Sequence, residues 1–222
     1  GKTMYVIPYL MAAPGSPLEA YAAGIELTAS NRNYKDDNHK PELIVALTDF
    51  YAMAGFRPLA RTRELFAALE CPELDHYVAM LDDDPSATTE SANLRVLFTT
   101  WITIPAAKRK ELISAIVAAG ERLIAADPTD WKSRVMSTVL DLNQRYPGDI
   151  GVLGALLLNH IELSPGEAVY LDAGQLHAYV SGLGVEIMAN SDNVLRGGLT
   201  PKFVDVPELV KVLTYAAADE PR

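Results

Sequence analysis

Two short segments of this 222-residue chain concentrate side chains that can bind metals, move protons or hold anions. The first is residues 34–42, which read Tyr-Lys-Asp-Asp-Asn-His-Lys-Pro-Glu. The second is residues 177–202, whose chemically useful side chains are His177, Tyr179, Glu186, Asp192, Arg196 and Lys202. Ordinary core sequence rarely has this density, because each buried charge needs a partner. The two segments, far apart in the chain, therefore predict one site assembled from both.

The combination of imidazole and carboxylate favours zinc as the metal of such a site. His177 follows a strand-to-turn pattern, where a side chain can point into the mouth of a barrel. A single histidine beside Leu and Ala is, however, more often a hydrogen-bonded core residue. Glu42 by itself could be a surface carboxylate at the start of a strand. Against that interpretation, Pro41 fixes the entry and the residues after Glu42 form a buried run.

The charge of the chain limits its partners. The formal net charge is −10, and no basic stripe is available to displace counterions from a nucleic acid. A phosphorylated sugar can still bind where local cations outweigh the global field. The cations within the two segments that could do so are Lys40, Arg196 and Lys202.

Composition favours a cytoplasmic protein. No run of eighteen or more apolar residues predicts a membrane span, and the start of the chain lacks the layout of a secretory signal. The single cysteine, Cys71, excludes an intramolecular disulfide and agrees with a cytosolic setting. We interpret Cys71 as a small half-buried hydrophobic residue before Pro72.

Hydrophobic patterning divides the chain into three zones and predicts an α+β fold. Residues 43–50 are typical of a short buried strand, and residues 59–146 follow a helical period. From residue 151 onward strand and turn signals alternate, with a turn at residues 164–167 and a strand from residue 168 that ends in a turn by residue 174. Short strands with Gly and Pro turns favour a β-sandwich or a jelly-roll barrel.

The helical zone has several apolar stripes that are more typical of a core than of a cofactor site. Pro105 suits the first turn of a helix, and both tryptophans are expected to be packing residues. His76 and His160 lie outside both segments and are expected to be structural. The stripes are Leu94, Leu97, Phe98 and Trp101; Leu112, Ile113, Ile116 and Val117; and Val135, Val139 and Leu142.

Taken together, the two segments resemble the signatures of the type I mannose-6-phosphate isomerases, also called phosphomannose isomerases. Residues 34–42 fit the family pattern Tyr-x-Asp-x-Asn-His-Lys-Pro-Glu throughout. Residues 177–202 fit the pattern from His-Ala-Tyr to Thr-Pro-Lys, except that Gly197 replaces the usual Ala. The resemblance implies cupin/jelly-roll-like β segments flanking a helical insertion. The implied domains are a partial cupin-like segment at 1–56, the insertion at 57–147 and a second cupin-like segment at 148–222.

The resemblance implies a zinc-dependent aldose–ketose isomerase that interconverts mannose 6-phosphate and fructose 6-phosphate through an enediol(ate). Such a reaction needs proton transfer, stabilisation of a developing anion and a clamp for phosphate. The implied roles are metal binding by Glu42 and His177; catalysis by Arg196, Lys40, His39 and Asp192; and substrate binding by Lys202, Tyr179 and Glu186.

The chain departs from the family in one important respect. The family takes two further zinc ligands from a Gln-x-His segment upstream of the first signature, and no such segment precedes Tyr34. Residues 11–16 lie roughly where it is expected. Two ligands alone would hold zinc weakly. The departure suggests a central fragment or a diverged member.

Two other functions remain open at this stage. One is a non-catalytic sugar-phosphate-binding or scaffold module with a degenerate metal site. The weaker one is a cupin-type metal oxygenase, which needs two histidines and a carboxylate. The expected partner is a phosphorylated hexose, with no nucleic acid and no membrane. The chain is expected to be either a monomer or a fragment that needs the rest of its barrel.

Overall fold

The computed structural model describes residues 10–12, 35–36 and 38–219. Tyr34 of the first signature and residues 13–16 of the upstream segment lie outside these ranges. The chain divides into two compact units. The β unit comprises Gly1–Gly55, Asn159–Thr214 and Glu220–Arg222, and the helical unit comprises Phe56–Leu158 and Tyr215–Asp219. The expected mixture of helix and sheet is confirmed.

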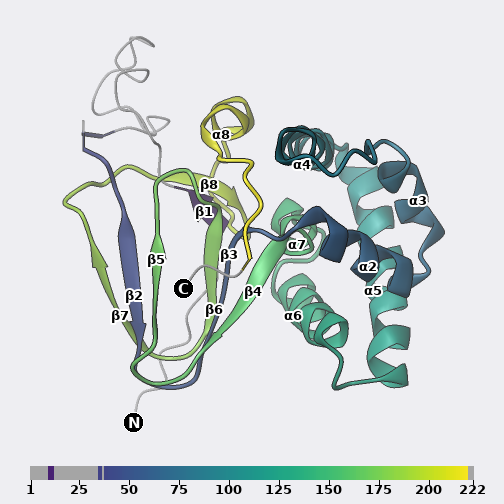
Figure 1. Cartoon of the computed structure of the whole chain (residues 1–222), viewed down its shortest axis with the longest axis horizontal. Coiled ribbons are helices and arrows are strands. Elements are labelled where there is room, and N and C mark those ends of the chain that lie inside the picture. Colours follow the sequence, from purple (N-terminus) through teal and green to yellow (C-terminus); the bar gives the residue numbers. More distant parts are fainter. Residues whose placement is uncertain (1–9, 13–34, 37, 220–222) are drawn as a thin grey trace. The chain divides into compact units, whose positions relative to one another are not determined.

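The β unit is built on two sheets (Figure 1). The five-stranded sheet has the order β4-β3-β6-β1-β8, and the three-stranded sheet has the order β5-β2-β7. In the smaller sheet β2 pairs antiparallel with β5 and β7, so the first signature lies beside the second. The strands are β1 (Leu10–Ala12), β2 (Glu42–Ala46), β3 (Phe50–Phe56), β4 (Leu158–Leu163), β5 (Ala168–Leu171), β6 (His177–Ser181), β7 (Gly184–Met188) and β8 (Leu195–Gly198).

The two sheets share one apolar core. Alternate residues of a strand face opposite sides of its sheet, and β2 follows this rule with Glu42, Ile44 and Ala46 buried. Ile44 and Ala46 belong to a buried cluster that draws on β2 and β5 of one sheet and on β3 and β4 of the other. The sheets therefore pack face to face, and the inward row of β2 ends in a carboxylate.

The strand expected at residues 43–50 is wrong at its C-terminal end. β2 ends at Ala46, and a turn leads into β3, which starts at Phe50. Leu47 is 51% exposed in this turn, and its amide donates to the Leu183 carbonyl at 2.8 Å. The turn contains neither Gly nor Pro, so the apolar pattern of residues 43–50 predicted one strand where the structure has the end of β2 and the start of β3. The expected turn at residues 164–167 and the strand that follows it are confirmed.

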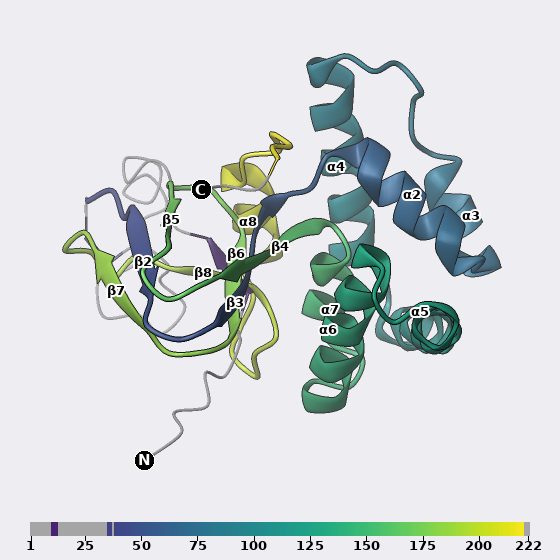
Figure 2. The same cartoon turned by 60° about the horizontal axis from the view of Figure 1, so that its bottom comes forward.

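The helical unit contains α2 (Leu59–Leu69), α3 (Pro72–Val78), α4 (Ala87–Ile102), α5 (Ala106–Ala126), α6 (Trp131–Arg145) and α7 (Ile150–Ala155) (Figure 2). The expected stripes on α4, α5 and α6 are confirmed, since nearly all their members are buried. The helix α7 was missed, because its six residues are too few to show a helical period. None of the described helices is both long and apolar enough to cross a membrane.

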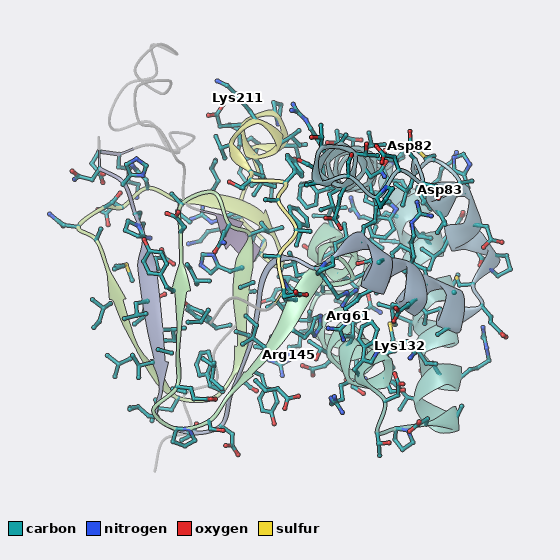
Figure 3. All side chains as sticks on the ribbon, viewed as in Figure 1. Arg61, Asp82, Asp83, Lys132, Arg145 and Lys211 are labelled. Carbon is teal, nitrogen blue, oxygen red and sulfur yellow. The ribbon has the colours of Figure 1, made fainter. Side chains whose placement is uncertain are left out.

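Aromatic packing organises the helical unit. Trp101 is buried and packs against Phe66 and Tyr77, as expected. Trp131 is only half-buried, and cations cover its ring. The Arg61 guanidinium lies 4.4 Å from the ring centroid and the Lys132 ammonium 5.3 Å; both side chains are labelled in Figure 3. Trp131 is therefore a platform for cations as well as a packing residue.

Cys71 is more buried than expected. It is 4% exposed and directly precedes α3, with Pro72 at the first position of that helix. Its thiol donates to the Glu73 carboxylate at 3.3 Å. Burial raises the pKa of this thiol, and the Glu73 contact raises it further. A thiol of raised pKa is a poor nucleophile, which agrees with a packing role.

Candidate functional site

Strand alternation places the first-signature side chains. Lys40 and Glu42 are two residues apart in an extended segment, so they face the same side as Ile44. Glu42 is 2% exposed, and the Lys40 side chain is 11% exposed. The Lys40 Nζ lies 3.1 Å from the Glu42 Oε1. The buried row of β2 thus ends in an ion pair rather than in an apolar side chain.

A tight turn delivers His177 to the same place. Gly174 has φ +83°, and a Cβ there would lie 2.8 Å from the Thr214 hydroxyl oxygen, so a larger residue would not fit. The turn leads into β6, whose first residue is His177. The His177 Nδ1 lies 3.0 Å from the Gln175 carbonyl oxygen. That contact fixes the ring and turns its Nε2 toward β2.

Glu42 and His177 face one another in the interior of the β unit. The Glu42 Oε2 lies 3.0 Å from the His177 Nε2, and both side chains are 2% exposed. Neither atom has a hydrogen bond of good geometry with any described residue. If the Nδ1 proton is given to Gln175, a neutral ring presents a bare lone pair to a carboxylate. Two buried electron-pair donors facing each other are suited to a shared cation.

Charge near Glu42 controls its ionisation. Burial raises the pKa of the Glu42 carboxyl, whereas a proton on the facing His177 Nε2 and the charge of Lys40 lower it. The net effect is a pKa below the ordinary value of a glutamate. Glu42 is therefore an anion at neutral pH, which is the form that binds a metal.

A second polar pair lies on the inward face beside the first. Glu186 of β7 is the register partner of Ile44, so it lies on the buried side of the smaller sheet. The Tyr179 hydroxyl donates to the Glu186 Oε1 at 2.7 Å. The Tyr179 ring lies 5.9 Å from the His177 ring, measured between centroids. Tyr179 thus connects Glu186 to the histidine.

Arg196 lies on the same row of the larger sheet as His177. Met11 of β1 is the register partner of His177 on one side and of Arg196 on the other. Residues in one row share a face, and two strand spacings separate their Cα atoms by about 10 Å. Within the described part of the chain, the Arg196 guanidinium forms no ion pair that would neutralise it. An available cation thus lies one strand away from the histidine.

The other expected residues are less closely placed. His39 and Asp192 are exposed and make no direct contact with the buried pair, although each belongs to a segment that the structure holds beside it. Lys202 is exposed beyond the end of β8, and the contact it shows is from its own amide to the Thr200 hydroxyl. These three residues are brought to the same unit but not to the same point.

Sequence reasoning missed two residues that join the signatures. Asn193 is 1% exposed, and its hydrogen bonds within the described ranges are to residues of the first signature and to Ser191. Asp36 accepts hydrogen bonds from the Asp192 amide and the Ser191 hydroxyl. Burial raises the pKa of Asp36, but these bonds, the Asn38 amide and the Lys40 charge together lower it below its ordinary value. The one signal in the sequence for Asn193 and Asp36 is that each is a polar residue within a signature.

The distance between Glu42 and His177 suits two ligands of one zinc ion. Ligands about 2.1 Å from a tetrahedral zinc stand roughly 3.4 Å apart, so Glu42 and His177 need to separate only slightly from 3.0 Å. The described residues contain no group of three or more His, Cys, Asp and Glu that could hold a metal. β1, beside His177, reads Leu-Met-Ala and adds no nitrogen or oxygen side chain. The pair therefore fits as half of a zinc site.

The fold and this pair define a class of protein: a two-sheet unit encloses a histidine–carboxylate pair suited to a divalent metal, and a helical unit interrupts it in sequence. Comparison with known proteins narrows the class. A family model described as the catalytic domain of type I phosphomannose isomerase matches residues 19–59. The mannose-6-phosphate isomerase of Escherichia coli K12 is 38% identical over 198 residues, covering 88% of this chain and 46% of the relative. The mannose-6-phosphate isomerase 2 of Arabidopsis thaliana is 39% identical over 189 residues, covering 82% and 42%.

Solved structures agree with the sequence relatives. The mannose 6-phosphate isomerase of Salmonella typhimurium bound to fructose 6-phosphate and zinc superposes with a TM-score of 0.76 at 35% identity. The match covers 95% of this chain and 52% of that one. By sequence and by fold the chain is similar to the type I phosphomannose isomerases, which confirms the resemblance. It spans about half the length of the curated relatives it matches.

Proposed function

We propose that this chain carries the zinc-binding half-site of an aldose–ketose isomerase that interconverts mannose 6-phosphate and fructose 6-phosphate. The observation that carries the proposal is the buried contact of 3.0 Å between Glu42 Oε2 and His177 Nε2. These atoms come from two different signatures, and neither has another hydrogen bond within the described ranges. Relatives of similar sequence are named mannose-6-phosphate isomerases, and one is solved with zinc and fructose 6-phosphate.

Glu42 and His177 would hold the zinc, with the remaining ligands supplied by water, substrate oxygens or residues beyond the described ranges. When bound, zinc supplies electrostatic stabilisation of the two sugar oxygens on which negative charge develops. Lys40 is already held beside Glu42 by an ion pair of 3.1 Å. An ammonium group has three donors, so Lys40 can hydrogen-bond a sugar hydroxyl while it remains paired.

The chain's other polar residues have distinct roles in the proposal. Moving a proton between adjacent carbons needs a group that accepts it and returns it, and His39 next to Lys40 is an imidazole that can do both. Arg196, on the same row as His177, stabilises the enediolate through its planar fork. Lys202 attracts the phosphate as a point charge. Tyr179 and Glu186 line the substrate side of the histidine, and Asp192 orients substrate or Arg196.

For the fold, we propose that the two sheets form part of a cupin barrel. The helical unit would then be an insertion between the barrel segments at residues 1–56 and 148–222. In support, β2 and β5 pair in one sheet although residues Phe56–Leu158 of the helical unit lie between them in sequence. The single cysteine supports a cytoplasmic location. A phosphorylated hexose is the proposed partner.

The experiment is a direct isomerase assay. Purified protein is saturated with zinc and incubated with mannose 6-phosphate, and fructose 6-phosphate is followed by NMR. The proposal predicts conversion by the wild type and its loss in His177→Ala. Wild-type protein that binds zinc and fructose 6-phosphate without converting them would refute the isomerase and favour the non-catalytic sugar-phosphate module.

A further inference from the structure

We infer that Asn193 is a positioning residue. Its side chain holds the backbone that leads to His39 and Lys40 in a fixed position relative to the loop that carries Asp192. The inference deepens the proposed function, because those are the residues to which catalytic roles are proposed. Its structural part rests on hydrogen bonds alone. None of the hydrogen bonds of Asn193 to described residues involves Glu42 or His177, so its effect on them passes through the backbone of the first signature.

The Asn193 amide uses its full hydrogen-bonding capacity on that segment. Its Oδ1 accepts from the Lys35 amide at 2.7 Å and from the Asp36 amide at 3.1 Å. Its Nδ2 donates to the Asp36 carbonyl at 3.0 Å and to the Asn38 carbonyl at 3.3 Å. A side-chain amide has two acceptor sites and two N–H donors, and all four are satisfied. Asn193 is 1% exposed, so water cannot replace these bonds.

Side chains of the first signature also form hydrogen bonds with the loop at residues 190–192. The Asp36 carboxylate accepts from the Ser191 hydroxyl at 2.8 Å and from the Asp192 amide at 2.7 Å. The Asn38 side-chain amide donates to the Asn190 carbonyl at 2.9 Å. Two loops more than 150 residues apart in sequence therefore hold each other from both sides.

The other end of the segment is fixed as well. The Ala189 amide donates to the Pro41 carbonyl at 3.1 Å, and Glu42 is the register partner of Met188. His39 and Lys40 thus lie between two anchors, one at Asn193 and one at the start of β2. Loss of the Asn193 anchor leaves the metal-facing pair in place and releases the His39–Lys40 end. Misplacement of a catalytic group by about 1 Å can cost about 100-fold in rate.

The test compares Asn193→Leu, which has similar volume and none of the four bonds, with Asn193→Asp, which keeps the two acceptors but loses both donors. The matched control is Asn93→Leu. Asn93 is also buried, and its side chain makes the same kind of two-way contact with the Asp82 backbone, but in the helical unit. The readouts are hydrogen exchange at the Lys35 and Asp36 amides, zinc content, turnover and the Michaelis constant.

We expect Asn193→Leu to lose at least about 10-fold of the exchange protection at Lys35 and Asp36, to keep its zinc, and to lose about 100-fold in turnover. The Michaelis constant should change less than turnover does, because Lys202, Tyr179 and Glu186, the proposed substrate-binding residues, are untouched. Asn193→Asp should fall between this variant and the wild type. Asn93→Leu should keep both turnover and protection at the two amides, which separates positioning from general loss of stability.

Wild-type protection at Lys35 and Asp36 in Asn193→Leu would overturn the inference, as would lost protection with unchanged turnover. Failure of the proposed function gives a different result: the wild type itself would show no turnover. In that case the exchange rates of the Lys35 and Asp36 amides, which Asn193 Oδ1 accepts from, still decide the positioning role. They should rise in Asn193→Leu and not in the control.

Discussion

Two substitutions of Glu42 can separate its contribution to metal binding from its contribution to the stability of the fold. It forms the ion pair with Lys40 through Oε1 and faces His177 through Oε2. Glu42→Ala removes both contacts, whereas Glu42→Gln keeps the shape of the side chain. The glutamine oxygen can still accept from Lys40, and its amide nitrogen can donate to the bare His177 Nε2. Only the charge and the metal-binding oxygen are lost.

The expected magnitudes follow from burial. Removing one member of a buried ion pair costs about 3–5 kcal/mol. Lys40 is 11% exposed, so we expect Glu42→Ala to lie near the lower limit, at about 3 kcal/mol. For a chain of this size that lowers Tm by about 6–12 °C. Glu42→Gln also removes the anion but keeps a hydrogen bond to the Lys40 ammonium, so it should cost only about 1.5 kcal/mol, or about 3–6 °C in Tm.

The assay has two parts. Thermal unfolding in the presence of a chelator reports the fold without metal, and competitive titration reports zinc affinity. Both variants should lose at least about 100-fold in zinc affinity, because even outer-shell partners of metal ligands are worth about 10- to 100-fold. Wild-type zinc affinity in Glu42→Gln would refute the ligand assignment. Equal loss of Tm in the two variants would refute the account of the ion pair.

Three further predictions concern other parts of the molecule. Arg196→Ala should lower turnover about 100-fold or more in steady-state kinetics on mannose 6-phosphate, and Arg196→Lys should recover only part of it; unchanged turnover and Michaelis constant would remove Arg196 from the mechanism. Trp101→Ala should cost about 3–5 kcal/mol, because the ring is buried, and a fall in Tm of only a few degrees would contradict its central place in the helical core. Asp36 has a lowered pKa in the folded state, so its stabilising effect is present above its ordinary pKa of 3.8 and fades as the pH falls through the lower folded value. The Tm difference between wild type and Asp36→Asn should therefore be larger at pH 6 than at about pH 3, and a difference independent of pH would contradict this.

Much of the fold could be predicted from local patterns. The stripe through Leu94 and Trp101 encodes α4 because one helical face must be apolar to pack, and the apolar run that starts at Leu43 indicates the strand β2. The turn after Ala46 could not be predicted, since Leu47 is apolar yet exposed and its amide donates to the distant Leu183 carbonyl. A turn held by a distant segment leaves no local pattern.

The candidate site shows the same limit. The clustering of residue types indicated one shared site, and the family resemblance assigned Glu42 and His177 to the metal. The structure places these two side chains 3.0 Å apart. Asn193 and Asp36 were not predicted as site residues, because the role of a buried amide or carboxylate depends on its hydrogen-bond partners. Those partners lie more than 150 residues away in sequence. Hydrogen-bond satisfaction across such a separation is a property of the folded chain.

The central claim is that Glu42 and His177 hold zinc together. The most direct measurement is anomalous diffraction at the zinc absorption edge from crystals of the zinc-saturated protein. We predict one strong peak about 2.0–2.2 Å from both Glu42 Oε2 and His177 Nε2, with these two atoms moved slightly apart. A map with no peak between them, or with zinc bound only elsewhere, would contradict it.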